Sequence, residues 1–156
     1  MSVKLYRRGP GDDEYPYTLG YARQSPTLRG RSLVPEVPLG DRIIRGGKEY
    51  PGLGVKYADL AGVRPVPTLV ETKTRFNART LYNAIGETIV KRQLLATEYN
   101  RAPDEIDARI VFGDAEFPGG DDLPRLAGKI AAALESVGIR WVVGRGDLGY
   151  EEVTSL

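Results

Sequence analysis

The feature that most constrains the fold is an apolar segment at residues 67–74 (PTLVETKT), which contains a carboxylate and an ammonium group. Leucine, valine and threonine are typical of β-strands, and a proline at the start of the segment is typical of a turn. Because successive side chains of a strand alternate between its faces, Glu71 and Lys73 are expected to point the same way. The segment therefore predicts a strand with one charged face.

A second strand is predicted immediately upstream, at residues 55–60, and the glycine and prolines between 61 and 67 predict a turn. If this turn is centred near residue 65, an antiparallel register places Asp59 across from Glu71. Asp59, Glu71 and Lys73 would then share one patch of a two-stranded ribbon.

Two neighbouring carboxylates repel each other, so such a pair persists most readily when a cation lies between them or one is protonated. The chain has no cysteine and no histidine, and ligand sets made only of oxygen favour a hard ion such as Mg²⁺ or Mn²⁺ over zinc. An alternative interpretation is a solvated strand face, on which a cross-strand acid and a neighbouring base contribute only a few tenths of a kcal/mol.

The segment that follows alternates between helix and strand patterns. A long helix is predicted over residues 80–99, with an apolar stripe that should pack on the sheet. A short strand of the buried type follows at 108–113. A second helix is expected between an Asp121 cap and Gly138, before a final strand at 139–143. The predicted order is strand, strand, helix, strand, helix, strand.

The spacing of Asp59 from the Glu71-Thr72-Lys73 strand, followed by a helix that contains residues 81–87, resembles the PD-(D/E)xK superfamily of restriction-endonuclease-like nucleases. The resemblance covers roughly residues 41–143. It implies an α/β fold with a restriction-endonuclease-like core, in which helices flank a central mixed sheet of about four to five strands. The expected organisation is a nuclease domain over 41–156, preceded by an extended N-terminal arm over 1–40.

The resemblance also implies a function and a set of roles. Asp59, Glu71 and the carbonyl group of Thr72 would bind Mg²⁺ or Mn²⁺, while Lys73 would serve the attacking water. The expected reaction is hydrolysis of phosphodiester bonds in nucleic acid, with DNA favoured over RNA. Some members of the superfamily carry a glutamine in the helix after a glycine, where this chain has Glu87.

The N-terminal residues 1–40 are rich in proline and glycine and show no helical period, so an extended arm is predicted rather than the first helix that supplies a further acid in many members. Glu36 and Glu49 are the candidates for that further acid. Tyrosines interleaved with arginines in the arm could stack on bases or pack on a neighbouring subunit, and the second is favoured.

Four basic residues near the proposed site are candidates for contact with nucleic acid: Arg75, Arg79, Lys91 and Arg92. Charges on helix faces are usually only solvated, which is the alternative for these residues. Arg92 falls inside the apolar stripe of its helix, where it could snorkel, pair with an acid or point into the active site.

Composition excludes several classes of protein. Without cysteine or histidine, the chain cannot form disulfide scaffolds, thiolate zinc sites or serine–histidine triads. The length of 156 residues fits one domain. No signal peptide or transmembrane segment is evident, so the cytoplasm is the expected compartment, without membrane association. A homo-oligomer or a subunit of a larger complex is expected, and a non-catalytic nucleic-acid-binding or assembly subunit with the same fold is the alternative function.

Overall fold

The computed structural model describes residues 15–39, 44–45, 48–49, 56–74, 76–113, 123–144 and 149–155. Its centre is a six-stranded sheet with the spatial order β1 (Ser32–Leu39), β4 (Lys56–Arg64), β5 (Thr68–Lys73), β6 (Asp107–Phe112), β7 (Ile139–Gly144) and β8 (Tyr150–Val153). Three helices are described: α1 (Tyr15–Gln24), α2 (Ala78–Glu98) and α3 (Leu123–Ser136). Short 3₁₀ helices span Pro26–Leu28 and Pro103–Glu105, and β2 (Ile44–Arg45) pairs with β3 (Lys48–Glu49) in a separate hairpin.

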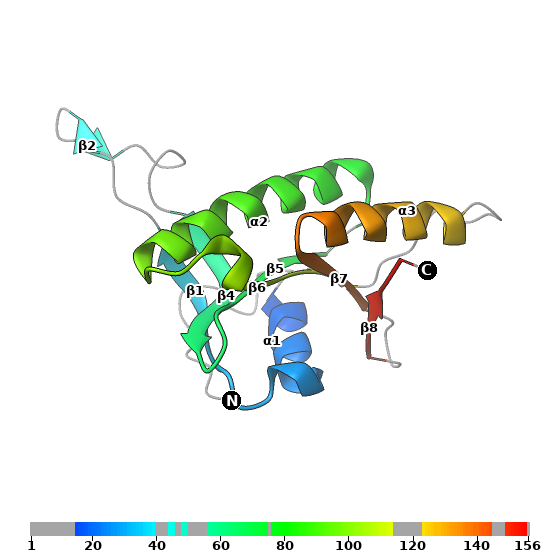
Figure 1. Ribbon diagram of the computed structural model, residues 1–156, viewed down its shortest axis with the longest axis horizontal. Coiled ribbons are helices and arrows are strands. Elements are labelled where there is room, and N and C mark those ends of the chain that lie inside the picture. Colours follow the sequence, from blue (N-terminus) through cyan, green and yellow to red (C-terminus); the bar gives the residue numbers. More distant parts are fainter. Residues whose placement is uncertain are drawn as a thin grey trace.

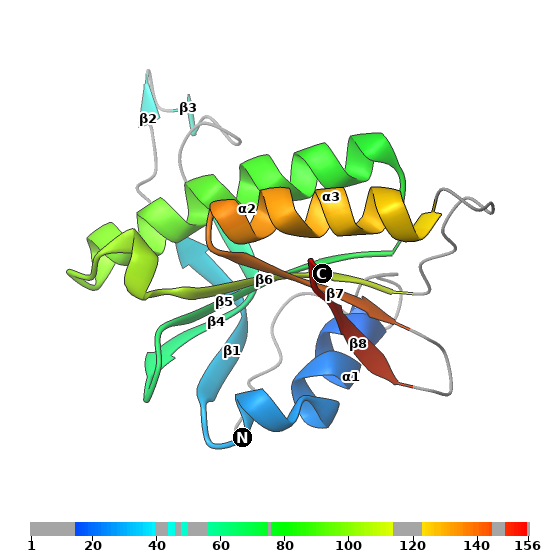
Figure 2. The ribbon, with the colours of Figure 1, turned by 45° about the vertical axis from the view of Figure 1, so that its right-hand side comes forward.

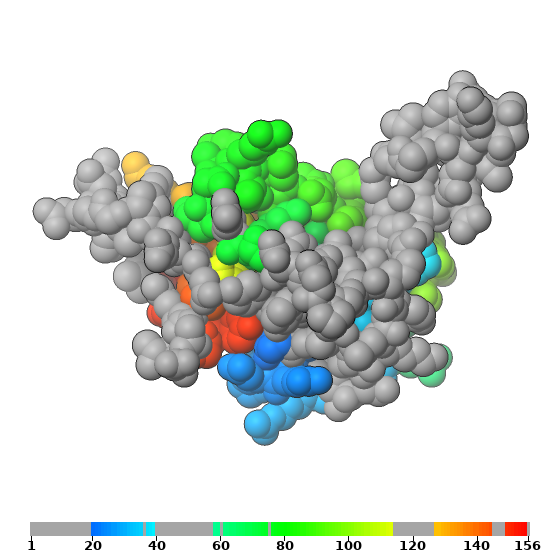
Figure 3. All heavy atoms as spheres, turned by 180° about the vertical axis from the view of Figure 1, so that it is seen from behind, coloured from blue at the N-terminus to red at the C-terminus, as the bar shows by residue number. Residues whose placement is uncertain are grey.

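The sheet is mixed, and its helices lie on both faces. β1, β4 and β5 are successive antiparallel neighbours, β5, β6 and β7 are parallel, and β8 returns antiparallel to β7. The two parallel connections run through α2 and α3, which lie side by side over one face, while α1 covers the other (Figures 1 and 2). Seen from behind, the green atoms of α2 and the blue atoms of the α1 segment lie at opposite sides of the molecule (Figure 3). The fold is therefore α/β, with a mixed central sheet between helices.

The hairpin of β4 and β5 has the predicted register. Leu60 lies opposite Val70 and Gly62 opposite Thr68, so the turn is centred on Pro65, as expected. β4 is longer than the predicted strand because it continues to Arg64. The ladder brings the two strands that carry the predicted acids next to each other.

Two apolar layers fix the helices to the sheet. On one face, side chains of α2 and α3 pack on alternate residues of the parallel strands, including Ile110 and Trp141. On the other face, Tyr21 of α1 packs with Val111 and Val142. Because β6 is covered on both faces, its residues from Ala108 to Phe112 are all buried, and they include the charged Arg109.

The long helix predicted from the sequence is α2, which begins slightly earlier than expected. The side chain of Asn77 accepts a hydrogen bond from the Thr80 amide at 2.9 Å, and the hydroxyl of Thr80 accepts one from the Asn77 amide at 3.0 Å. This reciprocal capping satisfies backbone donors that the first turn of a helix leaves unpaired. α3 also matches its prediction, although Asp121, the expected cap, lies outside the described residues.

The N-terminal region differs from the expected extended arm. Residues 15–39 form α1 and the edge strand β1, and both belong to the folded domain. Two residues that usually disfavour helices, Pro16 and Gly20, explain why the sequence pattern did not predict α1. Pro16 lies in the first turn, where proline is tolerated, and a Cβ atom at Gly20 would lie only 2.8 Å from the hydroxyl of Tyr150. Gly20 thus leaves room for the hydroxyl of Tyr150 from β8, a contact that the sequence did not predict.

Among the residues that the structure describes, no helix is both long enough and apolar enough to span a bilayer.

Candidate functional site

The predicted acids lie together on the central strands, under α2. Asp59 and Glu71 are 3% and 1% exposed, respectively. The register of Leu60 opposite Val70, continued by one residue, sets Asp59 beside Glu71. The amide of Thr72 donates a hydrogen bond of 2.7 Å to Oδ2 of Asp59, which fixes this carboxylate against β5. The hairpin therefore buries two carboxylates in adjacent positions.

Both charged residues of β5 reach α2, and each forms an ion pair there. Nζ of Lys91 lies 2.7 Å from Oε1 of Glu71, and Nζ of Lys73 lies 3.2 Å from Oε1 of Glu87. Glu87 and Lys91 are one helical turn apart, and their charged atoms are separated by 3.4 Å. Because Glu71 and Lys73 both contact the same helix, they share one face of β5. The result is a chain of alternating charges in the order Lys73, Glu87, Lys91, Glu71.

The electrostatics of the site centre on Glu71. Burial and the negative charge of Asp59 raise the pKa of Glu71 to about 8, although Lys91 offsets part of the effect. Burial alone would lower the pKa of Lys91, but Glu71 and Asp59 outweigh it and raise the pKa, so Lys91 stays cationic while Glu71 titrates. Burial alone would raise the pKa of Glu87, but Lys73 and Lys91 lower it.

Burial and the charge of Asp59 thus raise the pKa of Glu71 even though Lys91 forms an ion pair with it. A cation close to both carboxylates would favour the ionised form of Glu71. The available donors are oxygens, which suit Mg²⁺ or Mn²⁺. Within the described residues, no group of three or more histidine, cysteine, aspartate or glutamate side chains could hold a metal ion. An ion held by Asp59 and Glu71 would have to take its other ligands from backbone carbonyls, water or phosphate.

The two secondary acids lie on different sheets. Glu36 is on β1, where Pro35 pairs with Leu60 and Val37 pairs with Ala58, so the backbone of Glu36 is beside that of Asp59. Glu49 is on β3, in the separate hairpin. A role for Glu36 as a further acid stays a prediction, and its place in the ladder makes it the stronger of the two candidates.

The basic candidates that the structure describes lie in different environments. Arg79 is exposed in the first turn of α2, and Arg75 lies outside the described residues. Lys91 is 7% exposed and ion-paired within the site, rather than on a solvated surface. Nη1 of Arg92 donates a hydrogen bond of 2.7 Å to the carbonyl of Val137, just after α3. Arg92 therefore ties the two helices together, and of the four only Arg79 is shown on the surface.

The sequence did not predict that Lys91 would neutralise Glu71. A signal was present, because Lys91 continues the buried face of α2, at helical spacing from Ala84, Thr88 and Leu95. A lysine on the buried face of a helix indicates an acidic partner, here on β5.

A second buried ionic cluster lies on the opposite face of the sheet, and the sequence did not predict it either. Arg109, in β6, donates to both carboxylate oxygens of Asp107, at 3.0 and 2.7 Å. It also donates to the hydroxyls of Tyr21 and Thr27, at 2.7 and 2.6 Å, while Arg31 contacts Asp107 at 2.6 Å. Burial would raise the pKa of Asp107, but the hydrogen bonds from Arg109 and Arg31 lower it. This cluster fastens α1 and the segment after it to the sheet.

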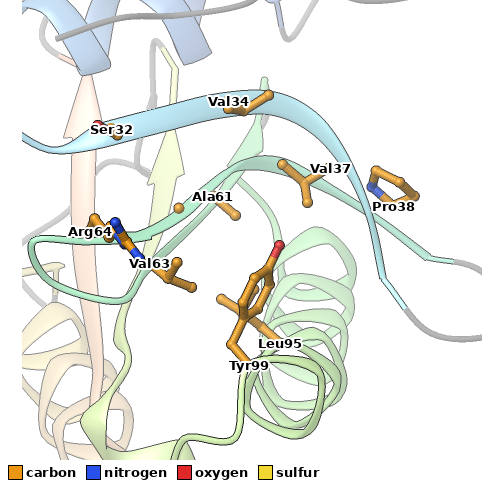
Figure 4. A pocket seen from close by; sticks show the side chains of 10 residues that line it. Ser32, Val34, Val37, Pro38, Ala61, Val63, Arg64, Leu95 and Tyr99 are labelled. Atoms are coloured by element: carbon orange, nitrogen blue, oxygen red, sulfur yellow. The ribbon is translucent and has the colours of Figure 1, made fainter.

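A cavity of about 360 Å³ opens between β1, β4 and the C-terminal end of α2. Val37, Ala61, Leu95 and the ring of Tyr99 line it (Figure 4). Its lining is mostly apolar and includes none of the charged residues of the candidate site, so the cavity is separate from the chemistry described above.

No protein-family model matches the chain, and neither the curated proteins nor the solved structures contain a significant match.

Proposed function

We propose that the chain is a metal-dependent nuclease of the PD-(D/E)xK superfamily, with a restriction-endonuclease-like fold, and that it hydrolyses phosphodiester bonds in DNA. One observation carries the proposal: two adjacent carboxylates, Asp59 and Glu71, are buried together, with Lys73 on the same face of β5. Burying two like charges costs stability, and a catalytic metal site is a chemical reason to keep them.

In this proposal, Asp59, Glu71 and the carbonyl of Thr72 hold Mg²⁺ or Mn²⁺. The bound ion supplies Lewis-acid polarisation of the phosphate and a lower pKa for a coordinated water. Lys73 orients the attacking water and stabilises negative charge that develops on the phosphate. For this role its ammonium exchanges Glu87, from which it is separated by 3.2 Å, for water and phosphate oxygens.

The side chain of Glu87 acts on Lys73 rather than on the substrate. Its side chain is 41% exposed and contacts both Lys73 and Lys91, so its carboxylate can bridge the two ammonium groups and keep them in place. Nucleic acid would approach at the first turn of α2, where the exposed guanidinium group of Arg79 suits phosphate contacts. DNA is favoured over RNA, as expected from the resemblance.

A second candidate is a non-catalytic nucleic-acid-binding or assembly subunit with the same fold. The observation that favours it is the chain of ion pairs from Lys73 to Glu71, because Lys91 already offsets part of the negative charge at Glu71 without a divalent ion. In such a protein the site would be a structural ion-pair network, and Asp59 and Glu71 would bind no metal.

A nuclease assay tests the first candidate. Single- and double-stranded DNA, and RNA in parallel, are incubated with Mg²⁺ or Mn²⁺ and the wild type, Glu71→Gln, Lys73→Ala or the control Asp104→Asn. Asp104 is exposed in the second 3₁₀ helix, away from the site. We expect cleavage by the wild type and the control and its loss in both site variants. Wild-type cleavage no faster than that of the site variants would exclude the nuclease.

A further inference from the structure

A second cavity, the α1-face cavity, lies where α1 and the 3₁₀ helix after it meet β7 and β8, and its volume is about 350 Å³. α1 and β8 lie next to each other there (Figure 2). Three of the lining side chains are polar and buried, since Tyr21, Ser25 and Arg109 are 3%, 8% and 1% exposed. The exposed Thr27 and Glu152 also line the cavity. Small-molecule sites are typically concave and contain a few convergent polar groups of this kind.

The guanidinium group of Arg109 fixes the direction of the hydroxyl groups beside it. Its Nη1 donates to the hydroxyl oxygens of Tyr21, Thr27 and Ser25, at 2.7, 2.6 and 3.5 Å. A guanidinium group has no acceptor atom, so these oxygens accept, and each hydroxyl hydrogen must point elsewhere. The hydroxyl oxygens of Ser25 and Thr27 are 3.1 Å apart, so one of the two donates to the other. The hydrogen of Tyr21 and one hydrogen of the Ser25–Thr27 pair are not used in these contacts.

Three donor hydrogens beside the cavity thus have no hydrogen-bond acceptor among the residues that the structure describes. Two are the hydroxyl hydrogens just named. The third is on Nη2 of Arg109, whose other hydrogen is donated to Oδ2 of Asp107 at 2.7 Å. Leaving a buried donor without an acceptor costs about 1–3 kcal/mol. An acceptor that enters the cavity would recover this free energy.

The charges around the cavity have the sign that suits an anion. Arg31 and Arg109 both contact Asp107, and Arg140 lies 4.0 Å from Asp107 and 3.8 Å from Glu152. Within the described residues, this cluster contains three guanidinium groups and two carboxylates, which gives it a net charge of +1. Because Arg31 and Arg109 are largely buried, water screens their charge only in part. One negative charge from a ligand would neutralise the cluster.

We propose that the α1-face cavity binds a small organic carboxylate. The two oxygens of the carboxylate accept the hydrogens of Tyr21, of the Ser25–Thr27 pair and of Arg109. Its single charge equals the excess positive charge of the cluster, and the carboxylate of Glu152 disfavours a ligand with two negative charges. The rest of the ligand lies against the apolar side chains that complete the lining. The proposal does not depend on the nuclease function or on the metal site.

Titration of the full chain with benzoate, benzamide and phenyl phosphate tests the proposal. The three probes share an aromatic ring and carry, at neutral pH, one negative charge, none and about two. Binding is followed by the chemical shifts of the backbone amides in two-dimensional NMR spectra. We expect benzoate to bind with a dissociation constant of about 1 mM or below and to shift the amides of residues 20–27 and 149–152. Benzamide and phenyl phosphate should each bind at least about tenfold more weakly.

Variants of the lining identify the groups that bind the carboxylate. Tyr21→Phe removes one donor and keeps the ring, and Ser25→Ala/Thr27→Val removes another, so each should weaken benzoate binding about tenfold. Tyr82→Phe, exposed on α2 across the sheet, is the matched control and should bind benzoate like the wild type. Glu152→Gln removes a negative charge beside the ligand and should tighten binding about threefold, which a loss of structure would not do. Circular dichroism verifies that each variant is folded.

A wild type that does not bind benzoate at about 10 mM would overturn the proposal. So would benzamide or phenyl phosphate that binds as tightly as benzoate, because a single negative charge would then not determine the ligand. Unchanged affinity in both Tyr21→Phe and the double variant would exclude the hydroxyl donors. If these variants are unfolded, Glu152→Gln decides together with the three probes, and an affinity for benzoate that does not rise in Glu152→Gln would contradict the proposal.

Discussion

The two faces of the central sheet each bury a cluster of charged residues, and they balance those charges differently. On the α1 face, Asp107 is held by Arg109 and Arg31, and its pKa is lowered. On the α2 face, Glu71 is also held by a cation, yet its pKa is raised to about 8. Burial is the first cause of the raised pKa of Glu71, and Asp59, a second buried acid next to it, is the second. A buried carboxyl group therefore has its pKa shifted in opposite directions on the two faces, according to the charges beside it.

The largest effect on stability is expected on the α1 face. Arg109→Ala removes one of the two guanidinium groups that hold the largely buried carboxylate of Asp107, and it removes a hydrogen-bond donor to the hydroxyl of Tyr21. The substitution should therefore lower the free energy of unfolding by about 3–5 kcal/mol. The measurement is urea unfolding followed by circular dichroism at neutral pH. A loss below about 1 kcal/mol would show that the Asp107 cluster is not what fastens α1 to the sheet.

On the α2 face, a substitution should affect activity instead. Lys73→Ala is expected to lower the rate of DNA cleavage by about 10²-fold or more, because the attacking water loses the group that orients it. Its stability should change by less than about 1 kcal/mol, since the pair with Glu87 is partly exposed to solvent. Single-turnover cleavage and urea unfolding of the same samples test both statements. A variant that loses stability and keeps its cleavage rate would reverse the contrast between the two faces.

The dependence of stability on pH should differ between the faces as well. The folded-state pKa of Glu71 is raised from 4.5 to about 8, so the folded state holds a proton that the unfolded chain releases, and stability falls as the pH rises through this range. Asp107 has a lowered pKa, so its contribution is present above its ordinary pKa of 3.8 and is lost as the pH falls below it.

Urea unfolding between about pH 2 and pH 9 tests this contrast. Glu71→Gln should remove much of the decline between about pH 5 and pH 8, and saturating Mn²⁺ should reduce the same decline in the wild type. A decline that is unchanged in Glu71→Gln would mean that Glu71 is not the group that holds the proton.

The smallest effect is expected at the rim of the α1-face cluster. Arg140 is 47% exposed and lies 4.0 Å from Asp107 and 3.8 Å from Glu152, so Arg140→Ala should change stability by less than about 0.5 kcal/mol. Thermal unfolding in low and high salt can detect such a change. A loss of stability comparable to that of Arg109→Ala would mean that the exposed Arg140 stabilises the cluster as much as the buried Arg109 does.

Local sequence signals predicted the part of the site that local geometry determines. Pro65 and Pro67 lie between β4 and β5 and marked the turn, and the turn fixed the register that sets Asp59 beside Glu71, whereas Gly62 lies inside β4. The alternation of a strand placed Glu71 and Lys73 on one face, and helical periodicity predicted α2 as the element above them. These inferences need only short-range rules, which explains why they agree with the structure.

The remaining features depend on contacts between distant segments. Nothing near Arg109 in the sequence identifies Tyr21 and Thr27 as its acceptors, because they lie more than eighty residues away. The role of Lys91 likewise requires the helix to lie over β5. Gly20 reads as a helix breaker until the ring of Tyr150 is placed against it. Sequence patterns predicted these elements poorly because tertiary packing outweighs local propensity at such positions.

Calorimetric titration with Mn²⁺ tests the claim that Asp59 and Glu71 together hold a divalent metal ion. Wild type and the exposed control Asp104→Asn should bind one ion with the same affinity. Asp59→Asn keeps an oxygen that can accept the hydrogen bond from the Thr72 amide but removes the charge, so it should bind at least about tenfold more weakly. Equal binding by wild type and Asp59→Asn, or no binding by the wild type, would contradict the claim.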